Sequence, residues 1–194
     1  VLKKIDELMS MELPISMIAP SHGVIWRDNP TQIVDKYREW ALQRGARQAA
    51  ILYDTMWQAT RRMAEVIGEG LTEAGVGCKL FHMATADRND VITEIFRSSA
   101  VIIGSPTLNN GLLPTIAPVL EDLKGLKFKN KIGAAFGSYG WSGEAVQQIE
   151  QRLDASSVQR VCEGVRARWQ PTDQDLNACR RLGRQIGEVM RNAD

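Results

Sequence analysis

From residue 48 onward, short apolar segments alternate with amphipathic helical patterns, and this alternation constrains the fold more than any other feature of the sequence. Runs rich in Ala, Val, Ile and Leu are typical of buried strands, and apolar residues recurring every three or four positions are typical of helices. Because a helix follows each strand, short right-handed crossovers place the strands parallel in one sheet with helices on both faces. The expected strands are 49–53, 77–83, 100–105, 131–136 and 157–169, and the expected helices are 60–74, 89–98, 114–125, one capped by Ser142 that ends near 153, and 173–191.

The third expected strand, AVIIGS at 100–105, is apolar almost throughout, as is typical of a strand that is covered on both faces. We therefore predict an α/β fold. It is a flavodoxin-like three-layer sandwich, with a five-stranded parallel sheet in the order 2-1-3-4-5 and helices on both faces. Ligands of such folds bind at the carboxyl ends of the strands, near the point where the strand order reverses.

Residues 1–47 lack the strand–helix repeat and form a separate section. An amphipathic helix is expected over 1–12, followed by an apolar stretch with an irregular loop that carries His22. A second helix is expected to run to about Gln43. We therefore divide the chain into an appended section, 1–47, and a flavodoxin-like α/β domain, 48–194.

Three loops follow the first, third and fourth expected strands, and the predicted sheet places all three at one edge. The first loop, TMWQAT at 55–60, leads into a helix, whose first N–H groups lack partners within the helix and favour an anion. Thr55 and Thr60 add hydroxyl donors, and the loop contains no lysine or arginine. It matches neither the nucleotide P-loop nor the GxGxxG fingerprint. We expect it to hold one phosphate, although an ordinary strand–helix turn is an alternative for this loop taken alone.

The other two loops, 105–111 and 137–143, are rich in glycine, asparagine and aromatic residues. Tyr139 and Trp141 can stack on a ring system, and Asn109-Asn110 can adopt left-handed turn conformations. The alternative for Trp141 is an aromatic residue packed in the core or at an interface. The alternative for the two asparagines is a plain turn. A phosphate beside a planar heteroaromatic ring fits flavin mononucleotide (FMN). The expected cofactor-binding residues are Thr55, Met56, Trp57, Gln58, Ala59, Thr60, Pro106, Thr107, Leu108, Asn109, Asn110, Gly111, Ser138, Tyr139, Gly140, Trp141, Ser142 and Gly143.

Two other protein classes, response-regulator receivers and serine hydrolases, fit the residues less well. A response-regulator receiver needs an aspartate after the third strand and a lysine after the fifth, whereas Asp54 follows the first strand and the third ends in Gly104-Ser105. A serine hydrolase needs a GxSxG elbow, which is absent, and His82 lies on the second expected strand as a packed or surface residue.

Composition excludes further classes. The formal net charge of +1 gives no reason to expect binding to nucleic acid or to an anionic membrane. No apolar run approaches the length of a membrane span, and there is no signal-peptide pattern. The three cysteines form no CxxC, so we expect reduced thiols in a cytoplasmic protein.

The segments YDTMWQAT, GSPTLNNGLLP and AFGSYGWSGE together resemble the flavodoxin domain of flavodiiron proteins, the oxygen and nitric oxide reductases that include flavorubredoxins. This resemblance covers about 48–191. PSHGVIWRDNP, at 20–30, resembles the tail of the same family's metallo-β-lactamase-like diiron domain. The match implies that His22 is the last histidine ligand of a diiron site. The HxExDH ligand run is missing here, so we expect this chain alone to hold no diiron centre.

The resemblance implies an electron-transfer module with no catalytic residue of its own. FMN would take electrons from a rubredoxin-like or flavin reductase donor and pass them to a diiron centre, which in the family belongs to the other subunit of a head-to-tail homodimer. Two alternatives stay open. One is a free-standing flavodoxin-like carrier or NAD(P)H:quinone reductase, which hydride transfer from a nicotinamide would favour. The other is a partner-binding domain without cofactor, which a protein that stays colourless with added FMN would favour.

Overall fold

The computed structural model describes residues 1–42 and 45–192. Contacts divide the chain into two compact units, Val1–Arg44 and Gly45–Asp194. Gln43, where the sequence predicted the end of the second helix, lies outside the described residues.

The first unit consists of two helices, α1 (Leu2–Met9) and α2 (Thr31–Leu42), joined by an extended segment. In that segment Ile18 and Trp26 form an isolated antiparallel bridge. An ion pair between Arg38 and Asp6, with N and O atoms 2.7 Å apart, links the two helices. Several large apolar side chains of this unit remain exposed, namely Leu8, Met9, Met11, Leu13, Met17, Val24, Ile25, Tyr37, Trp40 and Leu42.

The second unit contains a parallel sheet in the order β2-β1-β3-β6, and the next position is shared by two short strands, β7 and β8, which both pair with β6. The predicted parallel sheet and its strand order are therefore confirmed, with the fifth expected strand divided in two. The strands are β1 (Ala46–Tyr53), β2 (Gly77–His82), β3 (Ser98–Gly104), β6 (Ile132–Tyr139), β7 (Gln159–Arg160) and β8 (Val165–Arg168).

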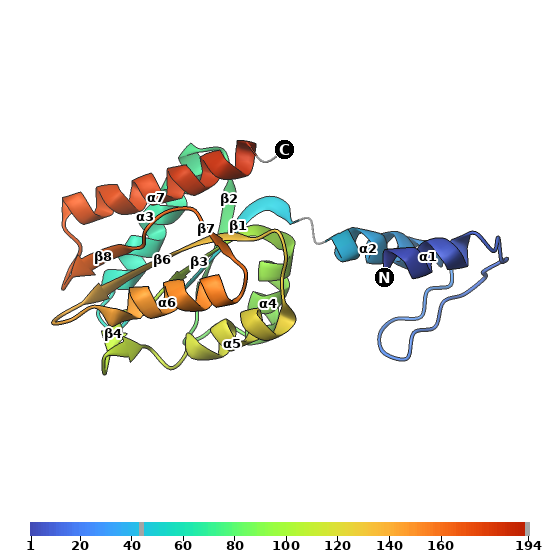
Figure 1. Cartoon of the computed structure of the whole chain (residues 1–194), viewed down its shortest axis with the longest axis horizontal. Helices are drawn as coiled ribbons and strands as arrows, with labels where there is room; N and C mark the ends of the chain where they lie inside the picture. The colour runs from blue at the N-terminus through green and yellow to red at the C-terminus, as the bar shows by residue number, and fades with distance from the viewer. Residues whose placement is uncertain (43–44, 193–194) are drawn as a thin grey trace. The chain divides into compact units, whose positions relative to one another are not determined.

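Helices cover both faces of the sheet, which gives the three predicted layers (Figure 1). One face carries α3 (Ala59–Glu73) and α7 (Asp173–Asn192). The other face carries α4 (Arg88–Arg97), α5 (Ala117–Leu126) and α6 (Glu144–Ala155). Among the helices of the described residues, none has the length and apolar character needed to cross a membrane.

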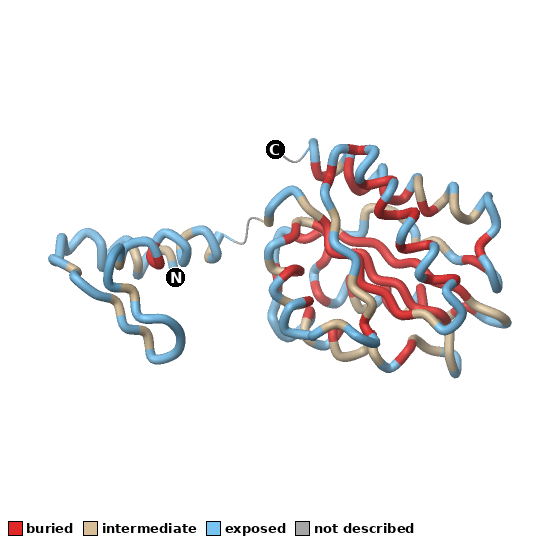
Figure 2. The backbone as a smooth tube through the Cα atoms, turned by 180° about the vertical axis from the view of Figure 1, so that it is seen from behind, coloured by how far each residue is buried: buried red, intermediate tan, exposed pale blue. Residues whose placement is uncertain are grey.

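Strand β1 shows how the sequence pattern builds this sandwich. Ala49, Ile51 and Tyr53 belong to the core under α3 and α7, whereas Ala50 and Leu52 belong to the core under the other three helices. Successive side chains of a strand point to opposite faces, so a strand buried on both faces must be apolar at every position. Figure 2 shows the result, with buried backbone concentrated in the central strands.

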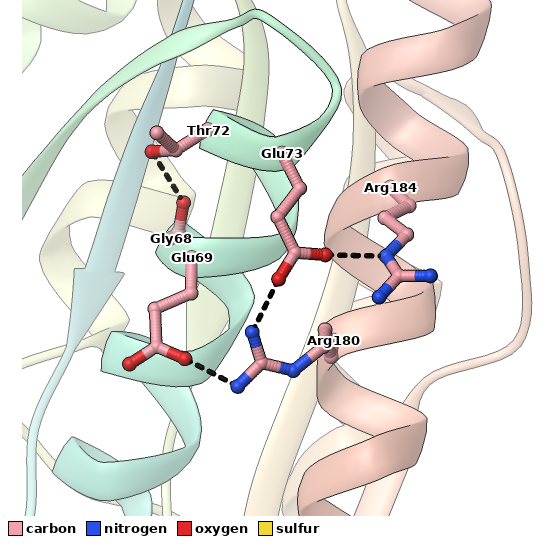
Figure 3. Close-up of polar contacts among 6 residues, drawn as sticks. All are labelled: Gly68, Glu69, Thr72, Glu73, Arg180 and Arg184. Carbon is pink, nitrogen blue, oxygen red and sulfur yellow. Dashed lines mark hydrogen bonds and ion pairs between the residues drawn. The ribbon is translucent and has the colours of Figure 1, made fainter.

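Helices α3 and α7 cross at backbone contact distance. A Cβ atom on Gly183 would lie 2.2 Å from the carbonyl oxygen of Ile67, and one on Gly70 would lie 2.2 Å from that of Arg180. At the rim of this crossing Arg180 pairs with Glu69 and Glu73, and Arg184 pairs with Glu73 (Figure 3). Hydrogen bonds from Arg180 and Arg184 lower the pKa of Glu73.

Two local predictions at helix starts are wrong. Helix α5 begins at Ala117 and not at Pro114, and this places Pro118 in the first turn, where its missing N–H removes no helical hydrogen bond. Ser142 does not cap α6. Gly143, with φ of 85°, is the N-cap residue, and the Ser142 hydroxyl donates to Oε2 of Glu144 at 2.7 Å.

Candidate functional site

A cavity of about 770 Å³ opens at the edge of the sheet where β1, β3 and β6 end. Its volume is in the range of sites that bind small molecules and cofactors. The three predicted loops supply most of its wall, and the end of β8 supplies the rest. The lining residues are Met56, Trp57, Ala59, Pro106, Thr107, Leu108, Asn109, Asn110, Ser138, Tyr139, Gly140, Trp141, Ser142, Trp169 and Gln170.

The first loop ends at the N-terminus of α3, where Gln58 is the N-cap residue in a left-handed conformation with φ of 64°. No side-chain hydrogen bond caps this helix start within the described chain. The hydroxyl oxygen of Thr55 is buried and has no hydrogen-bond partner among the described residues. Burying a hydroxyl without a hydrogen-bond partner costs free energy, so Thr55 indicates a position where a ligand would supply the partner. The free amides of a first helical turn add donors and the positive end of the helix dipole.

Thr60 lies in the first turn of α3 and is completely buried. Its hydroxyl oxygen is 3.1 Å from that of Ser138, which lines the cavity from the end of β6. This hydrogen bond connects the first predicted loop with the third. Thr60 therefore reaches the cavity through Ser138.

Asp54, the last residue before the first loop, is a buried carboxylate. Its Oδ1 accepts the Thr55 N–H at 2.7 Å and lies 3.1 Å from Nε2 of His82, and its Oδ2 accepts the hydroxyl of Thr115. The His82 ring also stacks on Tyr53, with ring centroids 5.4 Å apart, and burial raises the pKa of the Tyr53 phenol. Asp54 thus ties the ends of β1 and β2 to the chain after β5. Sequence reasoning treated Asp54 and His82 separately and missed this contact, because 28 residues separate them.

The second loop folds into a two-residue ladder between β4 (Thr107–Leu108) and β5 (Gly111–Leu112). Asn109 and Asn110 connect these strands with φ of 49° and 56°, so the predicted left-handed turn is confirmed. Helix α6 holds the loop at two points. The Ala145 N–H donates to Oγ1 of Thr107 at 3.3 Å, and Nε2 of Gln148 donates to the Asn110 carbonyl at 2.8 Å.

The third loop presents aromatic side chains at the cavity. Tyr139 and Trp141 both line it, and Trp141 is 85% exposed. On the first loop Trp57 is 81% exposed. Large aromatic side chains with this exposure are available to cover a planar ligand. Gly143 has φ of 85°, a conformation that favours glycine, and this turn leads the chain into α6.

The structure brings most of the predicted residues into one wall. The predicted residues that lie outside the lining are Thr55, Gln58, Thr60, Gly111 and Gly143. Trp169 and Gln170 line the cavity and were not predicted. A signal for them existed, because Trp169 is the last residue of the fifth expected strand, 157–169, and Gln170 follows it, and the carboxyl end of that strand lies at the same edge of the sheet.

His22 lies in the first unit, and its exposed ring has Nδ1 3.2 Å from the hydroxyl of Ser21. Over residues 1–42 and 45–192 no group of three or more His, Cys, Asp or Glu side chains is placed to hold a metal ion. Cys78, Cys162 and Cys179 are free thiols. Burial raises the pKa of Cys179 to about 12, so this thiol is a packing residue and not a nucleophile.

Comparison with known proteins places these features in a family. Residues 51–183 match the family model described as flavodoxin. Over 187 residues, the chain is 47% identical to the nitric oxide reductase of Moorella thermoacetica, an alignment that covers 96% of this chain and 47% of the relative. Rubredoxin oxygen:oxidoreductase from Desulfovibrio gigas superposes with a TM-score of 0.94 at 36% identity, covering 98% of this chain and 48% of that protein. The flavodiiron protein from Giardia intestinalis superposes with a TM-score of 0.89 at 28% identity and the same coverages. The chain thus spans about half the length of these relatives.

Proposed function

Because this chain belongs to the flavodoxin family, we propose that it binds one FMN and serves as the electron-transfer part of a flavodiiron oxygen or nitric oxide reductase. The resemblance to flavodiiron proteins indicated by its three loops agrees with its relatives, which are a nitric oxide reductase, a rubredoxin oxygen:oxidoreductase and a flavodiiron protein. The family supports a flavin as ligand. The choice of FMN is our proposal.

The observation that carries the proposal is the buried, unpartnered hydroxyl of Thr55 beside the uncapped N-terminus of α3. Together they suit one phosphate group. A second helix, α6, also begins near the cavity, but its start suits an anion poorly. Thr107 already accepts from the Ala145 N–H, and Glu144 places a carboxylate in the first turn. One phosphate position beside an aromatic wall supports FMN over the dinucleotide FAD.

In this arrangement the protein's own residues bind and orient. The α3 amides and the Thr55 hydroxyl would hold the phosphate, and Ser138, fixed by Thr60, would add a hydroxyl. Tyr139, Trp141 and the second loop would enclose the ring. The bound flavin would supply the electron-transfer chemistry. The lining side chains carry no formal charge and many are apolar, so they disfavour added negative charge at the ring and should lower its reduction potential.

We also propose that residues 1–47 are the tail of a diiron domain, with His22 as one ligand in the complete protein. The relatives align with 96–98% of this chain, so they include this section. Its many exposed apolar side chains support a surface that packs against further protein. In the complete protein, electrons would come from a rubredoxin-type or flavin reductase donor. They would go to the diiron centre of the partner subunit in a head-to-tail homodimer.

The ligand is tested by releasing the cofactor from purified protein and identifying it by chromatography. We expect FMN, in a ratio of about one per chain. Apoprotein should also take up FMN in preference to FAD when both are supplied. Recovery of FAD, or no uptake of FMN by the apoprotein, would refute the proposal.

A further inference from the structure

The end of β8 contributes to the cavity although it belongs to none of the three predicted loops. Trp169 and Gln170 directly follow Arg168, the last residue of this strand. Arg168 pairs in register with Tyr139 of β6, so the two strands deliver their following residues to the same place. The segment 168–170 thus lies beside the third loop.

Trp169 is held in a conformation that bulky residues rarely adopt. Its φ is 60°, in the left-handed region, where a side chain with a Cβ atom is unfavourable. The Trp169 N–H donates to the Tyr139 carbonyl at 2.7 Å, and this bond fixes the conformation. Residues kept in such regions by their surroundings concentrate at functional sites.

The side chain of Trp169 makes an edge-to-face contact with Trp141. The ring centroids are 5.1 Å apart and the planes are inclined by 71°. Gly140 makes room for this arrangement, because a Cβ atom there would lie 3.0 Å from the Trp169 ring. Trp141 is 85% exposed, so the contact with Trp169 restricts a side chain that otherwise has wide freedom.

Gln170 reaches in the other direction, to the first loop. Its Nε2 donates to the Trp57 carbonyl at 3.1 Å. Trp57 directly precedes Gln58, the left-handed N-cap residue from which α3 starts. This bond therefore fixes the loop immediately before the helix N-terminus that would hold the phosphate.

We propose that residues 168–170 are a fourth wall of the flavin site, in which Trp169 positions Trp141 at the ring end and Gln170 positions the first loop at the phosphate end. This inference rests on the proposed function. Both residues act by fixing groups before the ligand arrives, which reduces the ordering cost of binding. The two ends are then distinguishable, because riboflavin has the ring system of FMN but no phosphate.

The test is titration of stripped apoprotein with FMN and with riboflavin, followed by flavin fluorescence. Trp169→Ala should weaken both ligands by the same factor, roughly three- to tenfold. Trp169→Phe keeps an aromatic edge against Trp141, so its affinity for each flavin should stay within about twofold of the parent's. Gln170→Ala should weaken FMN by roughly three- to tenfold and riboflavin by a clearly smaller factor, because the loop that Gln170 fixes leads into the helix N-terminus that would hold the phosphate.

Two matched variants control for general effects. Trp40 makes a similar edge-to-face pair with Tyr37, at 5.4 Å, in the first unit, so Trp40→Ala removes an equivalent contact elsewhere. Gln185 donates from Nε2 to the Val161 carbonyl at 3.3 Å, so Gln185→Ala removes an equivalent hydrogen bond. Both variants should bind FMN and riboflavin like the parent.

The outcomes separate this inference from the function on which it rests. If the parent binds neither flavin, the proposed function and the fourth wall are both refuted. If the parent binds FMN and Trp169→Ala binds both flavins equally well, the fourth wall alone is refuted. The same holds if Gln170→Ala weakens riboflavin as much as FMN. Circular dichroism checks folding, and if Trp169→Ala is unfolded, Trp169→Phe and Gln170→Ala decide.

Discussion

The hydroxyl oxygens of Thr60 and Ser138 lie 3.1 Å apart in a buried position, although the two residues are separated by 78 positions in the chain. Thr60 belongs to the first turn of α3, and Ser138 is the second-last residue of β6. The pair joins the phosphate end of the proposed site to its ring end. Thr60 therefore acts on the proposed site through Ser138, and mutation can test this role.

Replacing Thr60 with alanine should weaken FMN binding with little change in flavin reduction potential. The variant leaves the Ser138 hydroxyl without its partner, so Ser138 is no longer fixed in the position from which it would contact the phosphate. Thr60 acts through Ser138, and a hydrogen bond between neutral groups contributes roughly 0.5–1.5 kcal/mol, so the affinity should fall by about two- to tenfold. Titration of the apoprotein measures it. Thr60→Ser, which keeps the hydroxyl, should restore most of the affinity, and parent-like binding by Thr60→Ala would show that the assignment is wrong.

Trp141→Ala should act at the ring end. Loss of aromatic cover should lower the FMN affinity by roughly three- to tenfold and should also shift the flavin reduction potential, because the ring becomes more exposed to water. A reductive titration of the bound flavin measures the potential. A change in affinity alone, with the potential of the parent, would contradict the placement of Trp141 at the ring.

Gly183→Ala should destabilise the second unit by separating α3 from α7. The added Cβ would lie 2.2 Å from the Ile67 carbonyl oxygen, and backbone atoms cannot yield as a flexible side chain can. Overpacking of this kind costs about 1–3 kcal/mol in the free energy of unfolding. Gly125→Ala in α5 is the matched control, because, apart from its chain neighbours and its own helix backbone, no atom of the described residues lies within 4 Å of its added Cβ. It should be neutral or slightly stabilising, and equal destabilisation of both variants in urea unfolding would refute the explanation.

Lys131 should make the stability of the protein depend on alkaline pH. It is buried, with Nζ donating to the carbonyls of Phe96 and Ser98, and burial lowers its pKa from 10.5 to about 8. Between these values the unfolded chain binds more protons than the folded chain. The Lys131 contribution to the free energy of unfolding therefore rises with pH through this window.

Lys131→Met removes this titration, so the unfolding free energy of the parent minus that of the variant should increase by roughly 1–3 kcal/mol between pH 7.5 and 10.5. Denaturant unfolding at several pH values measures the difference. Lys124→Met, at an exposed lysine, should show no such slope. A parent and a Lys131→Met variant with parallel pH profiles would contradict the assignment.

The purified chain should contain no stoichiometric iron. His22 is the one residue of the expected diiron ligand set present in the sequence, and a single imidazole does not hold two irons. Elemental analysis after washing with chelator measures the metal content. About two irons per chain, without a copurified companion chain, would contradict this expectation.

The sequence alone determined the architecture and the edge of the sheet at which the candidate site lies. Apolar runs such as 100–105 are local features, and strand–helix alternation leaves few topologies once crossovers are right-handed. The same logic placed the 55–60, 105–111 and 137–143 loops together, because parallel strands end at one edge of a sheet. The left-handed turn at Asn109 and Asn110 was also predictable, since it depends on the residues themselves.

Only the tertiary structure decided which side chains meet. The bond between Thr60 and Ser138, the Asp54 contacts with His82 and Thr115, and the Trp169 contact with Trp141 join residues from different strands and loops. Periodicity specifies which face of an element is buried, but it carries no information about side-chain contacts across the sheet at distances near 3 Å. Those contacts depend on strand register and helix packing, which the complete fold sets.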